Sequence, residues 1–546
     1  MTARVLVLIA LLTALPRMAQ AADYEVGPGQ AYAAIGDVPW ESLAPGDHVL
    51  IHWRDTPYKE KWVIGVSGTE AAPIVISGVP AADGKLPVID GNGATTRTEL
   101  DYTNEVRGVI KIGTSSVPPE TTPAWIVIEN LDVRSGRPPF TFTDHSGGTQ
   151  SYVDNAASIY VEKAQHLVIR NCIIRDSGNG LFIGVFNGET QDVLVEGNYV
   201  YDNGIEGSFY QHNSYTAALG ITFQYNHYGP LRTGCGGNNL KDRSAGTVIR
   251  YNWLEGGNRQ LDLVDGEDHP SVPNSPSYHE TFVYGNVLFE PNDDGNSQIV
   301  HYGGDSGDES IYRKGTLYFY NNTVVSHRSG NTTLLRLSTN EEHADVRNNV
   351  ISVSGAGSSL AMLGESGVLN LQNNWITSGW VDSHDNFGGT LTDGGNLDGE
   401  SAPGFVSDAD FHLAAGSSCI DAGMAQAPAV LPANDVLNQY VVHQAGQARP
   451  QVGSLDLGAF ELCDSDCPTP DGGVITPDAG TGGSGNTGGS GNTGGGKNNT
   501  GGSNAASGSG DDSGCGCRAA PAPVSAFAGL SFGALALLLL RRRRLQ

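Results

Sequence analysis

The sequence predicts an all-β protein folded as a single-stranded right-handed parallel β-helix, a solenoid with an asparagine ladder. Two observations support this class. A short apolar pattern recurs around regularly spaced asparagines. The body of the chain, residues 23–462, is also long for one globular core but normal for a fold that grows by adding coils.

The repeat contains nine units, each centred on an asparagine. The residue three positions earlier is large and apolar in all nine, and the residue two positions later is apolar or aromatic in eight, with Asp132 as the exception. This interrupted alternation predicts two short strands joined at a bend where asparagine tolerates a left-handed backbone. The nine residues are Asn130, Asn171, Asn198, Asn226, Asn252, Asn286, Asn322, Asn349 and Asn374.

The spacing of the repeat predicts one coil per unit. Regular units lie 25 to 28 residues apart, and gaps of 34 to 41 residues indicate coils with loop insertions. Stacking brings the asparagines into register about 4.8 Å apart, so that their side-chain amides bond to one another. We therefore assign them to architecture rather than to catalysis.

The N-terminus predicts export. Arg4 is followed by an apolar run at 5–15 and by small residues ending at Ala21, which is the order of a secretory signal peptide. We expect residues 1–22 to form this signal and the mature chain to begin directly after Ala21 or one residue later. The body is then an extracellular protein.

The C-terminus predicts attachment to a membrane. Residues 463–514, rich in Gly, Ser, Asn and Thr, indicate a flexible linker. In 515–546, Cys515 and Cys517 precede an apolar span at 524–540 and an arginine cluster. This order resembles the MYXO-CTERM sorting signal, which implies removal of the span and lipid attachment near the cysteines. The alternative is a plain membrane anchor, and either places the body at the cell surface or outer membrane.

Charge excludes one class of partner. The chain has 31 Lys and Arg against 59 Asp and Glu, a net charge of −28, whereas phosphate binding needs clustered cations. We therefore expect no nucleic acid partner, and we expect a monomer. An odd number of cysteines lies between the export signals, and the sequence does not give their pairing: Cys172, Cys235, Cys419, Cys463 and Cys467.

Two segments carry a resemblance to the pectin-lyase-like superfamily. The opening Leu-Ala-Pro-Gly-Asp-His-Val-Leu at 43–50, with Ala-Pro-Ile-Val-Ile at 72–76, resembles the first coils of secreted β-helix polysaccharide lyases. The closing Phe-His-Leu at 411–413 and Asp-Leu-Gly-Ala-Phe-Glu at 456–461 is similar to the last coil of extracellular β-helix proteins. The resemblance implies the fold, and one fold serves many functions.

One stretch, 212–268, predicts a column of polar residues on one outer face. If Leu240, Leu261 and Leu263 point inward, alternation turns Lys241 and Arg243 outward on one coil and Asp262 outward on the next. His212 and His301 occupy the expected equivalent positions on flanking coils. We include Asn213, Tyr215, Arg259, Asp262 and His301 as candidate substrate-binding residues.

This column suits β-elimination on a uronic-acid polysaccharide. The reaction needs a base, a group that neutralises the carboxylate, and an acid for the leaving oxygen. Lys241 is the expected base, with a pKa lowered by Arg243 and partial burial. Arg243 is the expected carboxylate clamp, and His212 or Tyr215 the acid.

The segment Asn-Leu-Lys at 239–241, followed by Val-Ile-Arg-Tyr-Asn at 248–252, resembles the catalytic region of polysaccharide lyase family six. The resemblance implies Lys241 as Brønsted base. This chain departs from the family at two places. Val264 stands where the family has its catalytic arginine, and the positions of the family's acidic calcium ligands are occupied here by Gly234, Cys235 and Gly236.

Two functions remain open at this point. One is a surface lyase acting on an acidic polysaccharide, and the other is a non-catalytic surface module that binds glycans or partner proteins. In the second, the charged residues form a structural ion-pair lattice between coils, made of Lys241, Asp242, Arg243 and Asp262. Ca²⁺ is a possible cofactor of either, through Asp265, Glu267 and Asp268.

Overall fold

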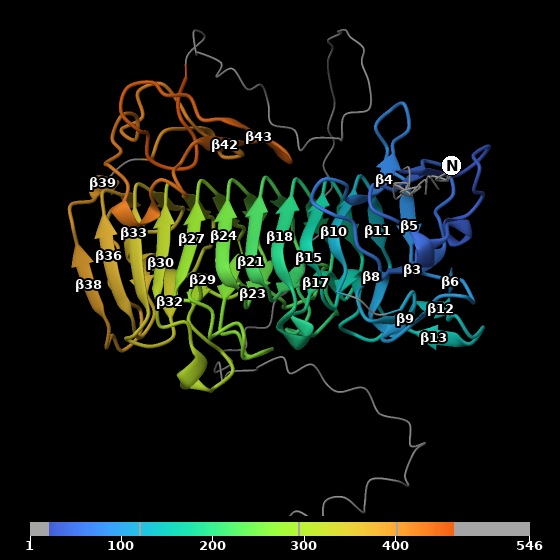
Figure 1. Cartoon of the computed structure of the whole chain (residues 1–546). Coiled ribbons are helices and arrows are strands. Elements are labelled where there is room, and N and C mark those ends of the chain that lie inside the picture. The colour runs from blue at the N-terminus through green and yellow to red at the C-terminus, as the bar shows by residue number, and fades with distance from the viewer. Residues whose placement is uncertain (1–20, 120–121, 293–294, 400–401, 464–546) are drawn as a thin grey trace, which may run out of the picture.

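The computed structural model describes residues 21–119, 122–292, 295–399 and 402–463. Within these ranges the chain winds into stacked coils whose strands form three long sheets (Figure 1), which confirms the expected parallel β-helix. No helix in the described part of the chain is long and apolar enough to cross a membrane. Residues 1–20 of the predicted signal peptide, most of the linker, Cys515, Cys517 and the apolar span at 524–540 lie outside the described residues.

The first sheet runs along one face of the solenoid. Its strands, in stacking order, are β1 (Asp23–Val26), β2 (His48–His52), β4 (Ile74–Val79), β10 (Ala124–Glu129), β15 (Gln165–Arg170), β18 (Gln191–Glu196), β21 (Leu219–Gln224), β24 (Ala245–Arg250), β27 (Glu280–Tyr284), β30 (Thr316–Tyr320), β33 (His343–Arg347), β36 (Val368–Gln372) and β38 (Thr390–Asp393). All of these neighbours pair in parallel.

The second sheet follows the first across the asparagine bend. Its strands are β5 (Val88–Asp90), β11 (Asp132–Arg134), β16 (Ile173–Arg175), β19 (Tyr199–Tyr201), β22 (His227–Tyr228), β25 (Trp253–Glu255), β28 (Val287–Glu290), β31 (Thr323–Ser326), β34 (Val350–Val353), β37 (Trp375–Thr377) and β39 (Leu397–Gly399).

The third sheet carries the candidate site. Its strands are β13 (Thr149–Ser151), β12 (Thr141–Thr143), β6 (Ala94–Thr96), β3 (Glu60–Ile64), β8 (Gly108–Ile112), β14 (Ala157–Val161), β17 (Asn179–Ile183), β20 (Ser214–Thr216), β23 (Leu240–Asp242), β26 (Leu261–Leu263), β29 (Gln298–Tyr302), β32 (Thr332–Leu337) and β35 (Leu360–Leu363). Only β12 and β13 pair antiparallel in this sheet as described.

Smaller elements lie in the loops. The described residues form the antiparallel pairs β7 (Asp101–Tyr102) with β9 (Ser115–Val117), β40 (Phe405–Ser407) with β41 (Asp410–Leu413) and β42 (Asn438–Val441) with β43 (Ala445–Ala448). Short 3₁₀ helices are η1 (Ile35–Asp37), η2 (Trp40–Ser42), η3 (Glu105–Arg107), η4 (Phe186–Gly188), η5 (Glu309–Ile311), η6 (Gly357–Ser359) and η7 (Pro428–Val430).

The asparagine ladder is present, and its rungs are buried except the last, Asn396, which is partly exposed. The Nδ2 of Asn226 donates to Oδ1 of Asn252 at 2.9 Å, and the Nδ2 of Asn252 donates to Oδ1 of Asn286 at 2.9 Å. Each of these oxygens also accepts the backbone N–H of the preceding rung. The ladder runs from Asn198 to Asn396, one rung beyond the last one expected from the repeat.

In the first two of the nine units, the ladder position lies one residue later than the sequence pattern predicts. Asn130 and Asn171 have φ of 59° and 54°, so they are the left-handed residues before the rung rather than rungs. Cys172 takes the rung position and donates its backbone N–H to Asn198. A one-residue shift exchanges the two faces of a strand. Asp132, the exception in the repeat, therefore faces outward and pairs with Arg175 at 2.8 Å.

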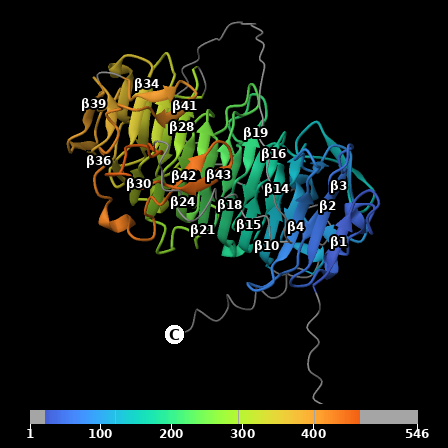
Figure 2. The ribbon, with the colours of Figure 1, turned by 90° about the horizontal axis from the view of Figure 1, so that it is seen from above.

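The closing segment is not a last coil, which corrects the expectation from its resemblance. The stacked strands end at β38 and β39, and residues 403–462 turn back along the outside of the coils (Figures 1 and 2). The physical reason is an apolar seam, since Phe411 and Tyr440 pack against Trp253 of an earlier coil. Of the cysteines, Cys463 is disulfide-bonded, and the structure gives these as free thiols: Cys172, Cys235 and Cys419.

Candidate functional site

The candidate site is a column of outward side chains on the third sheet. Lys241 of β23, Asp262 of β26 and His301 of β29 are paired in parallel register, as the alternation predicts. Their neighbours along each strand, Leu240 and Leu261, point into the core. Three successive coils therefore place a cation, an anion and an imidazole side by side.

The outward side chains of the column are buried. Loops 264–279 and 303–315 cover the column, so that the side chains of Lys241 and Asp262 are 4% and 2% exposed and that of Arg243 is 0% exposed. The polar groups of the site thus interact in a medium of low dielectric, where each charge needs a partner.

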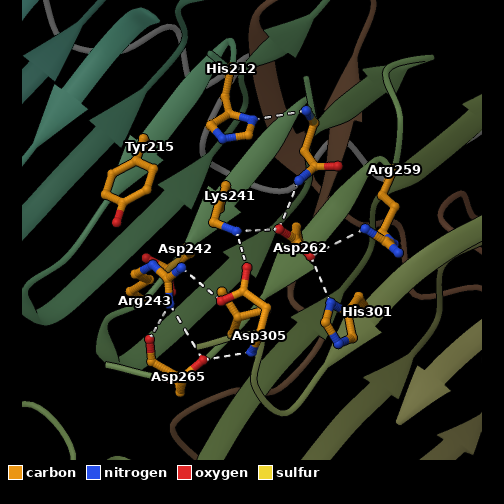
Figure 3. Close-up of polar contacts among 12 residues, drawn as sticks. His212, Tyr215, Lys241, Asp242, Arg243, Arg259, Asp262, Asp265, His301 and Asp305 are labelled. Atoms are coloured by element: carbon orange, nitrogen blue, oxygen red, sulfur yellow. Dashed lines mark hydrogen bonds and ion pairs between the residues drawn. The ribbon is translucent and has the colours of Figure 1, made fainter. Parts of the chain in front are cut away.

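Asp262 is the centre of the network (Figure 3). Its Oδ2 accepts from Lys241 Nζ at 2.9 Å and from Asn238 Nδ2 at 2.7 Å, and its Oδ1 lies 2.8 Å from Nδ1 of His301. Burial works to raise the pKa of Asp262, but the charge of Lys241 and the contact with His301 outweigh it, and the pKa lies well below its ordinary value. Asp262 is therefore an ionised acceptor, which fixes the proton of His301 on Nδ1.

A second carboxylate bridges the two cations of the column. Asp305, from the loop after β29, contacts Lys241 Nζ with one oxygen and accepts from Arg243 Nη2 at 2.7 Å with the other. Its backbone N–H donates to Asp265 Oδ1 at 2.7 Å. Figure 3 shows Asp305 between the two cationic side chains. The pair Lys241 and Arg243 is thus built to hold one carboxylate.

The pKa of Lys241 is raised, contrary to the lowering expected from the sequence. Burial and the charge of Arg243 lower this pKa, with burial the larger cause. The charges of Asp262 and Asp305 raise it, and their effect is greater. The sequence pointed to one acidic neighbour on the next coil but not to Asp305. In the structure Lys241 is therefore an ammonium group held by two anions.

His212 does not stand in the column. The position expected for His212, in register with Lys241, is occupied by Tyr215. The ring of Tyr215 stacks on that of Phe182, with centroids 5.3 Å apart. His212 lies before β20, where its Nδ1 accepts the backbone N–H of Asn238 at 2.9 Å. Burial first and the charge of Lys241 second lower its pKa to about 3, so the ring is neutral and carries its proton on Nε2. That Nε2 is buried without a hydrogen-bond partner among the described residues.

Asn213 is not placed to bind a substrate, which corrects its inclusion among the candidates. Its side chain is buried, accepts from Asn203 at 2.9 Å and donates to Asn239 at 2.7 Å. It therefore belongs to a second run of bonded amides inside the solenoid. Arg259 by contrast lies beside the column, 3.8 Å from Asp262, and donates to Gln298.

The three carboxylates predicted as metal ligands serve other groups. Asp265 and Glu267 lie on the guanidinium of Arg243, at 3.4 and 3.0 Å, and Asp268 accepts from the Tyr215 hydroxyl at 3.2 Å. Within the described residues no group of three or more His, Cys, Asp or Glu is arranged to hold a metal ion. Arg243 supplies the positive charge at this place.

Two members of the site were missed in the sequence. Asn238 donates to Asp262, and Asp305 bridges the cations. Asp305 follows two glycines after β29, in a loop whose path nothing in the repeat pattern constrains. The only available signal was an acidic residue four positions after the predicted His301.

No family model matches the chain, and no curated protein matches it. Among solved structures it is similar to the pectate lyase Pel9A, with 15% identity over 82% of this chain and 97% of that one and a TM-score of 0.44. An alginate lyase from Paenibacillus sp. str. FPU-7 gives 12% identity, 65% and 99% coverage and a TM-score of 0.35. XylC in complex with xylose gives 10% identity, 70% and 86% coverage and a TM-score of 0.37. At these identities the similarity concerns the fold.

Proposed function

We propose that the protein is an exported, surface-held polysaccharide lyase that cleaves an acidic, uronate-containing polysaccharide by β-elimination. One observation carries the proposal. Two buried cations, Lys241 and Arg243, converge on the two oxygens of a single carboxylate, that of Asp305. A uronate carboxylate in the same place contacts both groups, and Arg243 keeps its charge neutralised after Lys241 has lost a proton, which acidifies the proton on the adjacent C5.

The chain offers groups for each part of the elimination. Lys241, once neutral, takes the C5 proton, the C4–O bond breaks with its electrons on the leaving oxygen, and a C4–C5 double bond forms. Arg243 stays on the carboxylate, because its pKa lies far above its ordinary value and it does not release a proton. The donors for the leaving oxygen are the hydroxyl of Tyr215, which is in register with Lys241, or the unpartnered Nε2–H of His212.

A non-catalytic module is the second candidate, and one observation favours it. The charges of the column are paired with one another, and Lys241 has a raised pKa, as in a structural ion-pair lattice. In that function Lys241 serves only as a cation. The two functions therefore differ in whether an arginine can take its place.

The decisive experiment compares Lys241→Arg with the unchanged chain on a panel of uronate polysaccharides. Arginine keeps the charge and the contacts with both carboxylates but cannot act as a base. We expect the variant to stay folded and to lose at least about a hundredfold in the formation of unsaturated product, measured by its ultraviolet absorbance. Undiminished activity in Lys241→Arg would exclude Lys241 as the base, whereas no unsaturated product from the unchanged chain would favour the module.

The pH profile provides a second measurement. Since the pKa of Lys241 is raised, its neutral form is scarce at neutral pH and grows as the pH rises. We expect kcat/KM to increase with pH through the neutral and alkaline range. A profile that is already level through this range would exclude Lys241 as the base and leave His301, whose pKa is lowered by burial and whose Nε2 carries a lone pair, as the next group to test.

A further inference from the structure

The carboxylate of Asp305 differs from that of Asp262 in how firmly it is held. Asp262 lies within strand β26 and contacts Lys241, Asn238 and His301. Asp305 lies in a loop, and its side chain is 15% exposed, whereas that of Asp262 is 2% exposed. Of the two anions on Lys241, only Asp305 stands between the cations and the solvent.

The loop around Asp305 is fixed at its ends and free at its tip. At one end Ser338 Oγ accepts the N–H of Gly304 at 2.9 Å and also lies 2.9 Å from the carbonyl oxygen of Gly304. At the other end the guanidinium of Arg313 is fully buried and donates to the carbonyl oxygen of Val264 at 3.0 Å. Residues 307–310 between these points are exposed. Asp305 itself is held by its backbone N–H, which donates to Asp265 Oδ1 at 2.7 Å, so its carboxylate can leave the cations by rotation of the side chain while the backbone and the coils beneath stay in place.

From this geometry we infer that Asp305 is an internal stand-in for the substrate's carboxylate, which a uronate must displace before it can bind to Lys241 and Arg243. This inference rests on the proposed function and adds a specificity to it. A tethered carboxylate competes at an effective concentration of roughly millimolar or more. A single uronic acid competes poorly against it, whereas a polymer that is already held along the sheet presents its own carboxylates at comparable local concentration. The site therefore selects polyuronates over free uronic acids.

The test measures binding of free uronic acids to the full chain by calorimetry. Asp305→Asn removes the internal anion with almost no change of shape, and we expect it to bind D-galacturonate, D-glucuronate or D-mannuronate at least about tenfold more tightly than the unchanged chain. The methyl ester of the same sugar lacks the charge and should show no gain. Ser338→Ala, which releases Gly304 without altering a charge, should shift affinity in the same direction by a smaller factor.

Glu309→Gln is the matched control, because Glu309 is an exposed acid in the same loop. An equal gain in this control would show a general charge effect and overturn the inference. Unchanged, weaker or undetectable uronate binding by Asp305→Asn would overturn it as well. Binding is measured without turnover. Tighter uronate binding by Asp305→Asn, with no unsaturated product from any polysaccharide, would therefore contradict the lyase function alone. An active enzyme without the affinity gain would sink the stand-in alone.

Discussion

Two polar networks run through the same coils, and they differ in how completely they are bonded. In the asparagine ladder, Asn252 is buried, its Nδ2 donates to Asn286, and its Oδ1 accepts from Asn226. At the candidate site, the Nε of Arg243 in the column and the Nε2 of His212 beside it are buried without hydrogen-bond partners among the described residues. The ladder is neutral and saturated, whereas the candidate site is charged and retains unused donors.

This difference separates architecture from function. Buried polar groups in folded proteins are nearly all bonded, and a buried group that is not bonded calls for an explanation. In the ladder each coil repeats the same amide, which serves only stacking. In the column Lys241, Asp262 and His301 are three different groups at one position of three successive coils, an arrangement that stacking does not require.

The largest expected effect comes from breaking the column. Lys241→Ala leaves Asp262 and Asp305 facing each other without the cation, so we expect a loss of about 3 to 5 kcal/mol in the free energy of unfolding. This exceeds the contribution of an exposed ion pair, at most about 1 kcal/mol, because the side chains of Lys241 and Asp262 are buried. Denaturant unfolding measures the effect. Lys85→Ala, at an exposed pair with Asp83, should leave the midpoint unchanged, and equal midpoints for both variants would contradict the buried network.

Breaking the ladder should have a smaller effect. Asn252→Leu removes the acceptor of Asn226 and the donor to Phe223 and Asn286, so we expect a loss of about 1 to 3 kcal/mol. Thermal unfolding measures the loss, and activity per folded molecule should be retained. Asn396→Leu at the partly exposed last rung should cost less. If both substitutions leave the melting temperature unchanged, the ladder does not stabilise the fold.

The smallest expected effect is a dependence of stability on pH that the candidate site has through His212 and that the neutral amides of the ladder lack. The pKa of His212 is about 3 in the folded chain and 6.5 in the ordinary state, so the unfolded chain binds more protons between these values. Its contribution to stability is complete above pH 6.5 and is lost as the pH falls toward 3, by about 1 to 2 kcal/mol at pH 5. His212→Gln should flatten the stability curve between pH 7 and 5. Parallel curves for both chains would show that His212 is accessible to protons in the folded state.

The sequence predicts the fold because the coil repeats. Nine units report on one bend, so the average pattern survives two units that were aligned one residue out, at Asn130 and Asn171. The misfit at Asp132 was the visible sign of that error. The back-folded segment could not be predicted, because its contact with Trp253 joins residues far apart in the chain and follows no period.

The candidate site was predictable only where it lies on strands. Alternation within β23, β26 and β29 fixes the directions of Lys241, Asp262 and His301. Burial of the column and the position of Asp305 depend on loops, whose path the repeat does not encode. The sequence therefore predicts a lowered pKa for Lys241, whereas the second carboxylate, that of Asp305, helps to raise it.

The back-folded segment changes how the solenoid holds together. In a stack of coils each repeat is coupled to its neighbours alone, so such arrays can fray from an end. Here Gln444 donates to Gly197, Leu437 donates to Tyr251, and Gly458 donates to Asn348, each in a different coil. The segment acts as a splint along the array, and we expect the splinted coils to unfold together rather than one after another. Because these residues are synthesised after the coils, the splint can close only on a completed stack.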